Sequence, residues 1–201
     1  MNFQYLGNSS PSVLIVKNFF NDDELKLIWE ELDFLTKRNT LLSYDKTGSA
    51  TNGVAEMVKR NHGIFLDTVY GYRAASSILS LNSKIFSHGD VFAEHDPLFR
   101  HVKNCTIDTT LLSYYEDGDS YGTHTDQSNL TILTWFYKEP KMFTGGQFVL
   151  DDFGLEIEVE NNMLMIIPGS YKHSVLPVKM EDKTTYSGMG RYCVSHFLSY
   201  S

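Results

Sequence analysis

The stretch Thr106-Ile-Asp-Thr-Thr-Leu-Leu-Ser-Tyr-Tyr115 decides the fold class, because it opens a half of the chain that is rich in strand-forming residues. β-Branched and aromatic residues of this kind are typical of strands, and similar short runs follow, separated by Gly, Asn, Asp and Pro. The further predicted strands are 130–137, 147–150, 156–159, 163–167, 173–178 and 191–198. Seven short strands in succession predict a β-sandwich or barrel.

The first half of the chain is predicted to begin with a short strand over 13–17 and to be mainly helical after it. Asn21 is suited to cap a helix, and Glu24 stands three positions later, as in a capping box. Apolar residues then recur at helical spacing, which predicts a helix over 22–37. A second helical pattern covers 69–86 and predicts another helix there.

The length of 201 residues favours one domain with a sizeable core. No repeat or low-complexity stretch divides the chain. We therefore predict a single α+β, mainly β domain over 1–201, with N-terminal helical support over about 1–105 packed outside a β core over about 106–201.

The composition of the chain argues against several classes of function. Seventeen Lys and Arg against 25 Asp and Glu leave a formal charge of -8, which disfavours nucleic acid and anionic membranes as partners. The apolar run 13–16 is too short for a signal peptide or a membrane span, so we expect a cytoplasmic protein. Cys105 and Cys193 are expected to be buried free thiols, without a redox role.

Two His-x-acid triplets occur among the seven histidines, where about one is expected by chance. The first, His88-Gly89-Asp90, follows the second helical pattern in a glycine-containing turn, and we interpret it as capping and turn residues. The second, His124-Thr125-Asp126, lies at a strand edge. In an extended segment positions 124 and 126 point to the same face and can share one metal ion.

A third ligand must come from another strand, and His173 is the natural candidate because it opens the predicted strand 173–178. Two imidazoles and one carboxylate on one face of an iron ion are typical of non-haem Fe(II) oxygenases. The remaining open positions can take a bidentate 2-oxo acid and O2. The predicted metal site is therefore His124, Asp126 and His173.

A 2-oxo acid with a distal carboxylate needs a buried cation, and arginine suits this task because its fork binds carboxylate bidentately. Arg191 starts a strongly apolar final strand, where a charge requires a reason. A solvated position at the strand end is the alternative interpretation of this residue.

Several motifs, taken in their order along the chain, resemble those of the Fe(II)/2-oxoglutarate dioxygenase superfamily. They are His124-Thr-Asp126, Thr144-Gly-Gly-Gln-Phe-Val-Leu150, Met163-Leu-Met-Ile-Ile-Pro-Gly-Ser-Tyr-Lys-His173 and Arg191-Tyr-Cys-Val-Ser195. The tyrosine-rich strand before the triplet and the Gly-Gly-x-Phe segment are most similar to the prolyl 4-hydroxylase-like branch. The resemblance implies a double-stranded β-helix (jelly roll), Fe(II) on His124, Asp126 and His173, and 2-oxoglutarate chelating the iron with Arg191 on its far carboxylate.

The chain departs from the family pattern at two points. Family members commonly place the basic residue about ten positions after the distal histidine, where this chain has Lys183. We prefer Arg191 because Lys183 lies in a polar stretch that resembles an inserted loop. The family often has a tyrosine near 2-oxoglutarate, and spacing to the triplet favours Tyr115 over Tyr114, with Tyr121 as a further candidate.

The function implied by the resemblance is hydroxylation of an unactivated C–H, with a prolyl residue of a peptide or protein expected as substrate. Fe(II), 2-oxoglutarate and O2 are then required, ascorbate is expected as reductant, and succinate and CO2 are co-products. The alternatives are the same chemistry on a free amino acid, a small metabolite or an alkylated nucleic acid, or a cupin-like metal protein without oxygenase activity. The sequence leaves the oligomeric state open, and a lid over 43–61 is one interpretation of that polar loop.

The other four histidines have no partner at ligand spacing and are expected to be surface or packing residues. They are His62, His95, His101 and His196. His196 lies five positions after Arg191, so a regular strand would point the two side chains to opposite faces.

Overall fold

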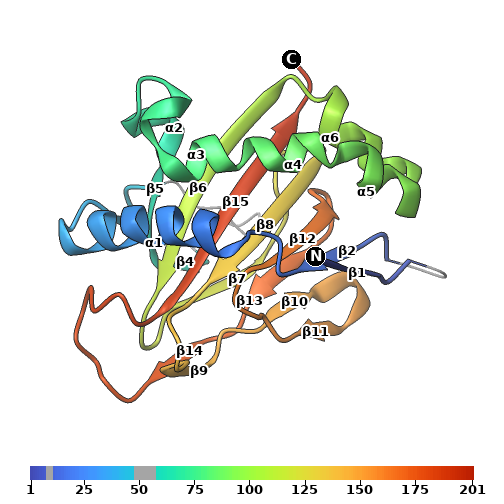
Figure 1. The fold of residues 1–201 in the computed structure, drawn as a ribbon. Coiled ribbons are helices and arrows are strands. Elements are labelled where there is room, and N and C mark those ends of the chain that lie inside the picture. Colours follow the sequence, from blue (N-terminus) through green and yellow to red (C-terminus); the bar gives the residue numbers. More distant parts are fainter. Residues whose placement is uncertain (8–10, 48–57) are drawn as a thin grey trace.

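The computed structural model describes residues 1–7, 11–47 and 58–201. Two antiparallel sheets form its core, and helices cover one of them (Figure 1). The large sheet has eight strands, in the order β1 (Asn2–Tyr5), β2 (Leu14–Lys17), β12 (Met163–Pro168), β8 (Leu130–Phe136), β15 (Arg191–Ser199), β6 (Ile107–Tyr115), β5 (His62–Phe65) and β3 (Leu42–Ser43). The small sheet has five, in the order β11 (Leu155–Ile157), β10 (Phe148–Leu150), β13 (His173–Val175), β7 (Ser120–His124) and β4 (Lys59–Arg60).

A separate pair of strands and a set of short helices complete the description. The pair is β14 (Val178–Met180) with β9 (Phe143–Gly145). The α-helices are α1 (Asp22–Lys37), α2 (Leu66–Val69), α3 (Ser77–Leu81), α4 (Ser83–Ser87), α5 (Gly89–His95) and α6 (His101–Asn104), and the 3-10 turns are η1 (Arg73–Ala75), η2 (Pro97–Arg100) and η3 (Asp151–Phe153). None of the described helices is long and apolar enough to cross a membrane.

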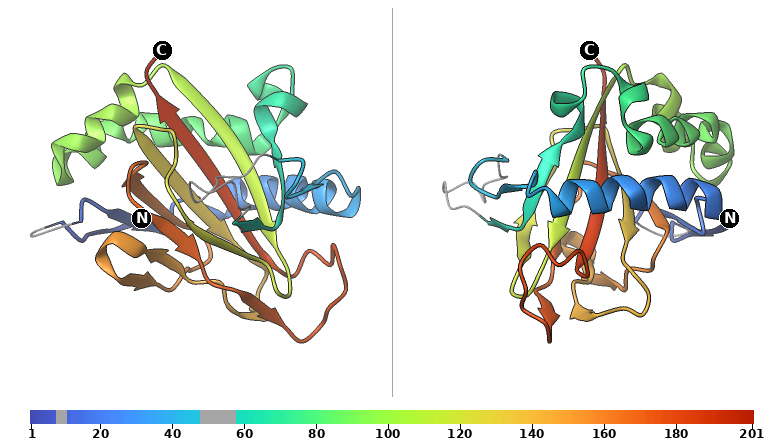
Figure 2. Two further views of the ribbon diagram at one scale, coloured as in Figure 1. Left: turned by 180° about the vertical axis from the view of Figure 1, so that it is seen from behind. Right: turned by 60° about the vertical axis from the view of Figure 1, so that its left-hand side comes forward.

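Helix α1 begins where its sequence predicts. The Asn21 side chain accepts from the Glu24 backbone N–H at 2.9 Å, and the Glu24 carboxylate accepts from the Asn21 N–H at 2.8 Å. This capping box supplies partners for N–H groups that have none within the helix. The helix then lies across the large sheet, as the turned views in Figure 2 show.

The prediction of one helix over 69–86 was wrong, because the segment is broken into short pieces. A contact from α1 starts a new helix in the middle of it: the Glu31 carboxylate accepts from Ser76 Oγ at 2.7 Å and from the Ile78 N–H at 2.9 Å. Ser76 Oγ in turn accepts from the Leu79 N–H at 3.0 Å and caps α3. A capping partner from a distant helix therefore overrides the local periodicity.

The strand prediction succeeded for the long runs and missed short ones. Strands β1, β3, β4, β5, β7 and β9 were not predicted as such, and the predicted strand 173–178 divides into β13 and β14 at Pro177, which has no N–H for a ladder. The mainly β, α+β fold class is confirmed. Both cysteines are free, although Cys105 is only half-buried.

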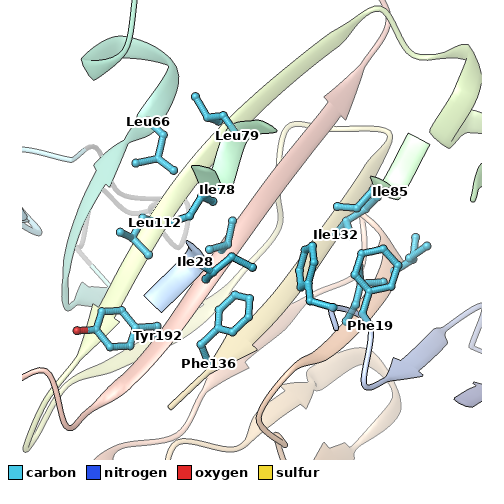
Figure 3. Close-up of a cluster of buried hydrophobic side chains, with 14 of the residues drawn as sticks. Phe19, Ile28, Leu66, Ile78, Leu79, Ile85, Leu112, Ile132, Phe136 and Tyr192 are labelled. Carbon is cyan, nitrogen blue, oxygen red and sulfur yellow. The ribbon is translucent and has the colours of Figure 1, made fainter. Parts of the chain in front are cut away.

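The two faces of the large sheet carry different apolar clusters. The cluster under the helices joins Phe19, Ile28, Ile78, Ile85 and Tyr192 with their neighbours (Figure 3). The cluster on the other face lies between the two sheets and includes Trp135, Phe148 and Met165. Successive residues of a strand point to opposite faces of the sheet. The central strands of the large sheet therefore present one set of side chains to the cluster under the helices and the other set to the cluster between the sheets.

Candidate active site

The sheet pairing brings His124, Asp126 and His173 together between the two sheets. His124 ends β7 and His173 opens β13, and the two are paired directly across these antiparallel strands. The Asp126 backbone N–H donates to Gly169 O at 2.9 Å, which ties the turn after β7 to the loop before β13. One ligand atom from each of the three residues lies within 4.8 Å of the others, and no other such group occurs in the described part of the chain.

Hydrogen bonds orient each ligand group. His124 Nδ1 donates to Gly122 O and His173 Nδ1 donates to Tyr171 O, both at 2.9 Å, because a carbonyl oxygen can only accept. The two Nε2 atoms then carry the lone pairs, and they lie 3.8 and 3.5 Å from the Asp126 carboxylate oxygens. Thr131 Oγ1 donates to Asp126 Oδ2 at 2.6 Å and fixes the carboxylate. Fixed outer partners of this kind are usual around metal-binding histidines.

Burial keeps His124 neutral. Desolvation, followed by the neighbouring His173, lowers the pKa of His124 to about 4. Neutral imidazole is the form that binds a metal ion. A buried set of two imidazoles and one carboxylate therefore fits a first-row metal such as Fe(II).

A cavity of about 670 Å³ opens beside these three residues. Along β15 its wall is formed by Arg191, Cys193, Ser195 and Phe197, which alternate with residues that face the helices. Their partners across the strand pair on β6 line the cavity as well, and they are Tyr115, Ser113, Leu111 and Thr109. The cavity is therefore polar and charged at its Arg191 end and mainly apolar at its Phe197 end.

Arg191 is a fully buried cation with no hydrogen-bond partner among the described residues. Its side chain is 0% exposed, and none of Nε, Nη1 and Nη2 has a hydrogen-bond partner within the described chain. The guanidinium lies over the Tyr115 ring at 4.9 Å and the Trp135 ring at 5.7 Å. A buried charge is costly unless it is paired, so this end of the cavity fits an anion such as a carboxylate.

Gly146, the second residue of the Gly145-Gly146 pair, makes room for this arginine. Gly146 has φ +70, and a Cβ there would meet Arg191 Cδ at 3.1 Å and Val178 Cγ2 at 2.9 Å. A larger residue would strain the backbone and push against the arginine side chain. The Gly-Gly-x-Phe motif thus has a steric role next to Arg191.

The other candidates for the carboxylate-binding cation and for the cosubstrate tyrosine lie in different parts of the structure. Lys183 is outside the cavity, and its Nζ pairs with Asp117 Oδ2 at 3.2 Å on the surface. Tyr115 faces the cavity, whereas the Tyr114 hydroxyl accepts from the Gly188 and Gly190 N–H groups at 2.9 and 3.1 Å on the other face. Tyr121 stacks on His124 with ring centroids 3.7 Å apart.

The remaining histidines do not line the cavity, and one of them differs from expectation. His196 does point away from Arg191, but it has a partner that spacing did not indicate: its Nδ1 donates to Asp108 Oδ1 at 2.9 Å. In the first triplet, His88 lies between α4 and α5, and Asp90 pairs with Lys103 at 2.7 Å on the surface. The expected lid over 43–61 falls mostly on residues 48–57, which lie outside the described residues.

Two buried side chains with polar groups are not marked by any pattern in the sequence. Lys59 lines the cavity and is 1% exposed, and Trp135 is fully buried with no partner for its Nε1–H among the described residues. Lys59 lies in a polar loop region and Trp135 in an apolar strand, so neither local pattern marks it. The pairing of distant strands brings Lys59 to the cavity and Trp135 beside Arg191.

Comparison with known proteins gives one sequence relative. No protein-family model matches the chain. A PKHD-type hydroxylase of Gloeothece citriformis (strain PCC 7424) is 32% identical over 87 residues, which covers 38% of this chain and 40% of that protein. The chain therefore matches less than half the length of this curated relative.

Solved structures match over nearly the whole chain. A prolyl hydroxylase from Trichoplax adhaerens, in complex with a peptide fragment of the hypoxia inducible factor oxygen degradation domain, has a TM-score of 0.63 and 16% identity, covering 93% of this chain and 83% of that chain. A prolyl-4-hydroxylase from Pseudomonas putida has a TM-score of 0.60 and 16% identity, covering 94% and 92%. A 2OG-Fe(II) oxygenase family oxidoreductase from Burkholderia pseudomallei has a TM-score of 0.53 and 14% identity, covering 93% and 84%.

Likeness at such identities shows the fold. The predicted double-stranded β-helix with outer helices is confirmed by these matches and by the two facing sheets. The chain therefore has the same fold as these prolyl hydroxylases and this 2OG-Fe(II) oxygenase family protein, as the resemblance in its sequence implied.

Proposed function

We propose that this protein is an Fe(II)- and 2-oxoglutarate-dependent dioxygenase that hydroxylates an unactivated C–H, with a prolyl residue of a peptide or protein as its substrate. One observation carries the proposal: a buried set of two imidazoles and a carboxylate shares a cavity with an arginine whose three nitrogen atoms have no partner among the described residues. Together they match a metal-chelating 2-oxo acid with a distal carboxylate.

His124, Asp126 and His173 would hold the iron, which together with 2-oxoglutarate and O2 supplies the oxidising power for hydroxylation. Hydrogen bonds within the protein orient these three side chains without a bound metal ion. Backbone carbonyls hold both Nδ1–H groups, and Thr131 holds the carboxylate, so the donor atoms need no rearrangement.

Arg191 would orient the cosubstrate through its far carboxylate. Aromatic rings lie beside the guanidinium on two sides, and Phe148 connects this wall to the metal site, packing against Trp135 at 5.8 Å and His173 at 5.2 Å between ring centroids. These rings exclude water from the reacting centre, which strengthens the charge interactions inside it.

The substrate would approach from the mainly apolar end of the cavity. Phe65, Leu111 and Phe197 line that end, and Thr109 adds a hydroxyl. An apolar pyrrolidine ring suits such a wall, and a structural neighbour from Trichoplax adhaerens holds a peptide. These two observations support a prolyl peptide as the substrate class.

The test is succinate formation from 2-oxoglutarate with Fe(II) and ascorbate. Asp126→Ala removes the carboxylate ligand and should abolish turnover, whereas Asp90→Ala, the acid of the other His-x-Asp triplet, should leave it unchanged. Equal activity of wild type and Asp126→Ala would sink the proposal. Mass spectrometry of a prolyl-peptide panel, read as gain of one oxygen atom, then tests the substrate class.

A further inference from the structure

Arg191 lies where two strands end, so its position depends on the chain that precedes it. It is the first residue of β15 and is opposite Tyr115, the last residue of β6. On its other side, the pairing of β15 with β8 begins only at Tyr192. The Arg191 backbone is therefore paired with one neighbouring strand only, at the end of a ladder, where chain segments open most easily.

The Arg191 side chain forms no hydrogen bond that could fix its direction. Its guanidinium packs on two aromatic rings, and no polar group of the described residues binds it. The direction of its three nitrogen atoms then depends on the backbone at 190–192. A group that fixes this backbone fixes the donors as well.

The Tyr114 phenol holds this backbone from the helix-covered face of the sheet. Tyr114 is 0% exposed, and its hydroxyl oxygen accepts from the Gly188 N–H at 2.9 Å and the Gly190 N–H at 3.1 Å. A Cβ at Gly190 would meet Tyr114 Cε2 at 3.0 Å, so ring and backbone are in close contact. The Tyr114 ring also packs against Tyr192, with 4.5 Å between centroids. Both chain neighbours of Arg191 therefore contact one tyrosine.

The segment that Tyr114 holds connects β14 with β15. Residues 181–185 of this segment are exposed. Nearer to β15, the Glu116 carboxylate accepts from the Ser187 N–H at 3.2 Å. Two buried acceptors, a phenol and a carboxylate, therefore anchor the chain between an exposed stretch and Arg191.

We propose that Tyr114 is a positioning residue for cosubstrate binding: it holds the backbone on either side of Arg191, and thereby the guanidinium, in the position that binds the distal carboxylate of a 2-oxo acid. The proposal rests on the function proposed above. Tyr114 itself does not touch the cosubstrate, because its side chain lies on the face of the sheet away from the cavity. A guanidinium that is already in place loses less freedom on binding, which raises the affinity.

Tyr192 offers a matched control for Tyr114. It is also 0% exposed, and its hydroxyl oxygen lies 2.7 Å from Thr36 Oγ1 on α1. Tyr192→Phe therefore removes a buried phenol hydrogen bond from the same pair of rings, but it leaves the segment before Arg191 attached. Tyr114→Phe keeps the ring and removes the acceptor of the two glycine N–H groups.

Two 2-oxo acids of equal chain length test the proposal, since 2-oxoglutarate carries the distal carboxylate and 2-oxopentanoate lacks it. Calorimetry on the Mn(II)-loaded protein measures both affinities. Tyr114→Phe should weaken 2-oxoglutarate binding by about five- to tenfold and leave 2-oxopentanoate binding unchanged, whereas Tyr192→Phe should bind both acids like wild type. In the Arg191→Met background, Tyr114→Phe should cause no further loss, because its effect passes through the arginine.

The contrary outcomes are distinct. An unchanged 2-oxoglutarate affinity in Tyr114→Phe, an equal loss for both acids, an equal loss in Tyr192→Phe, or a further loss in the Arg191→Met background would each overturn the positioning role. A wild type that does not bind 2-oxoglutarate, or binds the two acids equally, would overturn the proposed function and the positioning role with it. Should Tyr114→Phe not fold, as judged by thermal unfolding, Glu116→Ala removes the other anchor of the segment and carries the same comparison.

Discussion

Arg191 and His196 lie on the same strand and are both 0% exposed, but their surroundings differ. His196 faces the helices, and its Nδ1 donates to Asp108, whose other oxygen accepts from Arg73 Nη2 at 2.8 Å. Arg191 faces the cavity, and its three nitrogen atoms have no partner in the part of the chain that is described. Two side chains five positions apart on one strand thus differ: His196 Nδ1 has a charged partner within the fold, whereas His196 Nε2 and all three Arg191 nitrogen atoms have none among the described residues.

The two faces of the strand therefore have different roles: one stabilises the fold, and the other is available for ligand binding. Folded proteins pair most of their buried polar groups, because an unpaired group costs free energy. The face under the helices follows that rule at Asp108. On the face towards the cavity, Arg191 is an exception to this rule. A bound carboxylate would supply the missing partner.

The sharpest test of the comparison is Arg191→Met. We expect 2-oxoglutarate affinity to fall by about 100-fold or more, because a charged hydrogen-bond partner is lost. The free energy of unfolding should not fall, because an unpaired buried charge is replaced by an apolar side chain of similar length. Calorimetry and denaturant unfolding measure the two effects. A large loss of stability would show that the arginine is part of the structural framework.

The opposite pattern is expected for Asp108→Asn. The change removes the charge that pairs with His196 and Arg73, and should lower the free energy of unfolding by about 2 kcal/mol. The affinity for 2-oxoglutarate should stay within about twofold of wild type, because Asp108 does not line the cavity. Denaturant unfolding and calorimetry again give both numbers, and a parallel loss of affinity would break the separation of the two faces.

The Asp108 contribution should also depend on pH. Burial alone would raise the pKa of Asp108, but hydrogen bonds and charge from His196 and Arg73 lower it below its value in the unfolded chain. A depressed folded pKa gives stability that is present above the unfolded pKa of about 4 and is lost as the pH falls through the folded pKa. The stability gap between wild type and Asp108→Asn should therefore narrow below about pH 4. Unfolding curves at a series of pH values would show a constant gap if the pair carried no charge.

A smaller effect is expected where the backbone supports Arg191. Gly146→Ala should lower stability by about 1 kcal/mol, from the strain of a positive φ, and should also weaken 2-oxoglutarate binding severalfold, because the Cβ presses on the arginine. The control is Gly154→Ala, whose φ is +59 and whose Cβ would meet nothing within 4 Å. That variant should show the strain without the binding defect. Identical affinities of the two variants would contradict the steric role of Gly146.

The smallest effect is expected at the start of α1, far from the cavity. Asn21→Ala removes the capping side chain and should cost about 1 kcal/mol of stability. Cosubstrate affinity should not change, because α1 packs on the face that carries His196. Thermal unfolding with and without 2-oxoglutarate measures both, and a changed ligand-induced shift would show that the faces are coupled.

Features that depend on near neighbours along the chain could be predicted from the amino-acid sequence. The capping box of α1, the long strands and the His124-Thr-Asp126 triplet are local patterns, and the triplet's spacing alone puts two ligand groups on one face of an extended segment. His173 could be predicted as the third ligand because it opens a predicted strand that follows the triplet in the sequence. The fold class followed from these same local signals.

The face of the sheet on which each remaining residue lies depends on the tertiary structure and could not be predicted from the local pattern of residues. Tyr115 rather than Tyr114 faces the cavity because sheet register fixes the alternation, and Lys183 lies on the surface beside Asp117. Lys59 enters the cavity because β4 pairs with β7, a contact between segments far apart in sequence. Periodicity reports only which residues share a face, whereas burial and partners depend on what the fold places against that face.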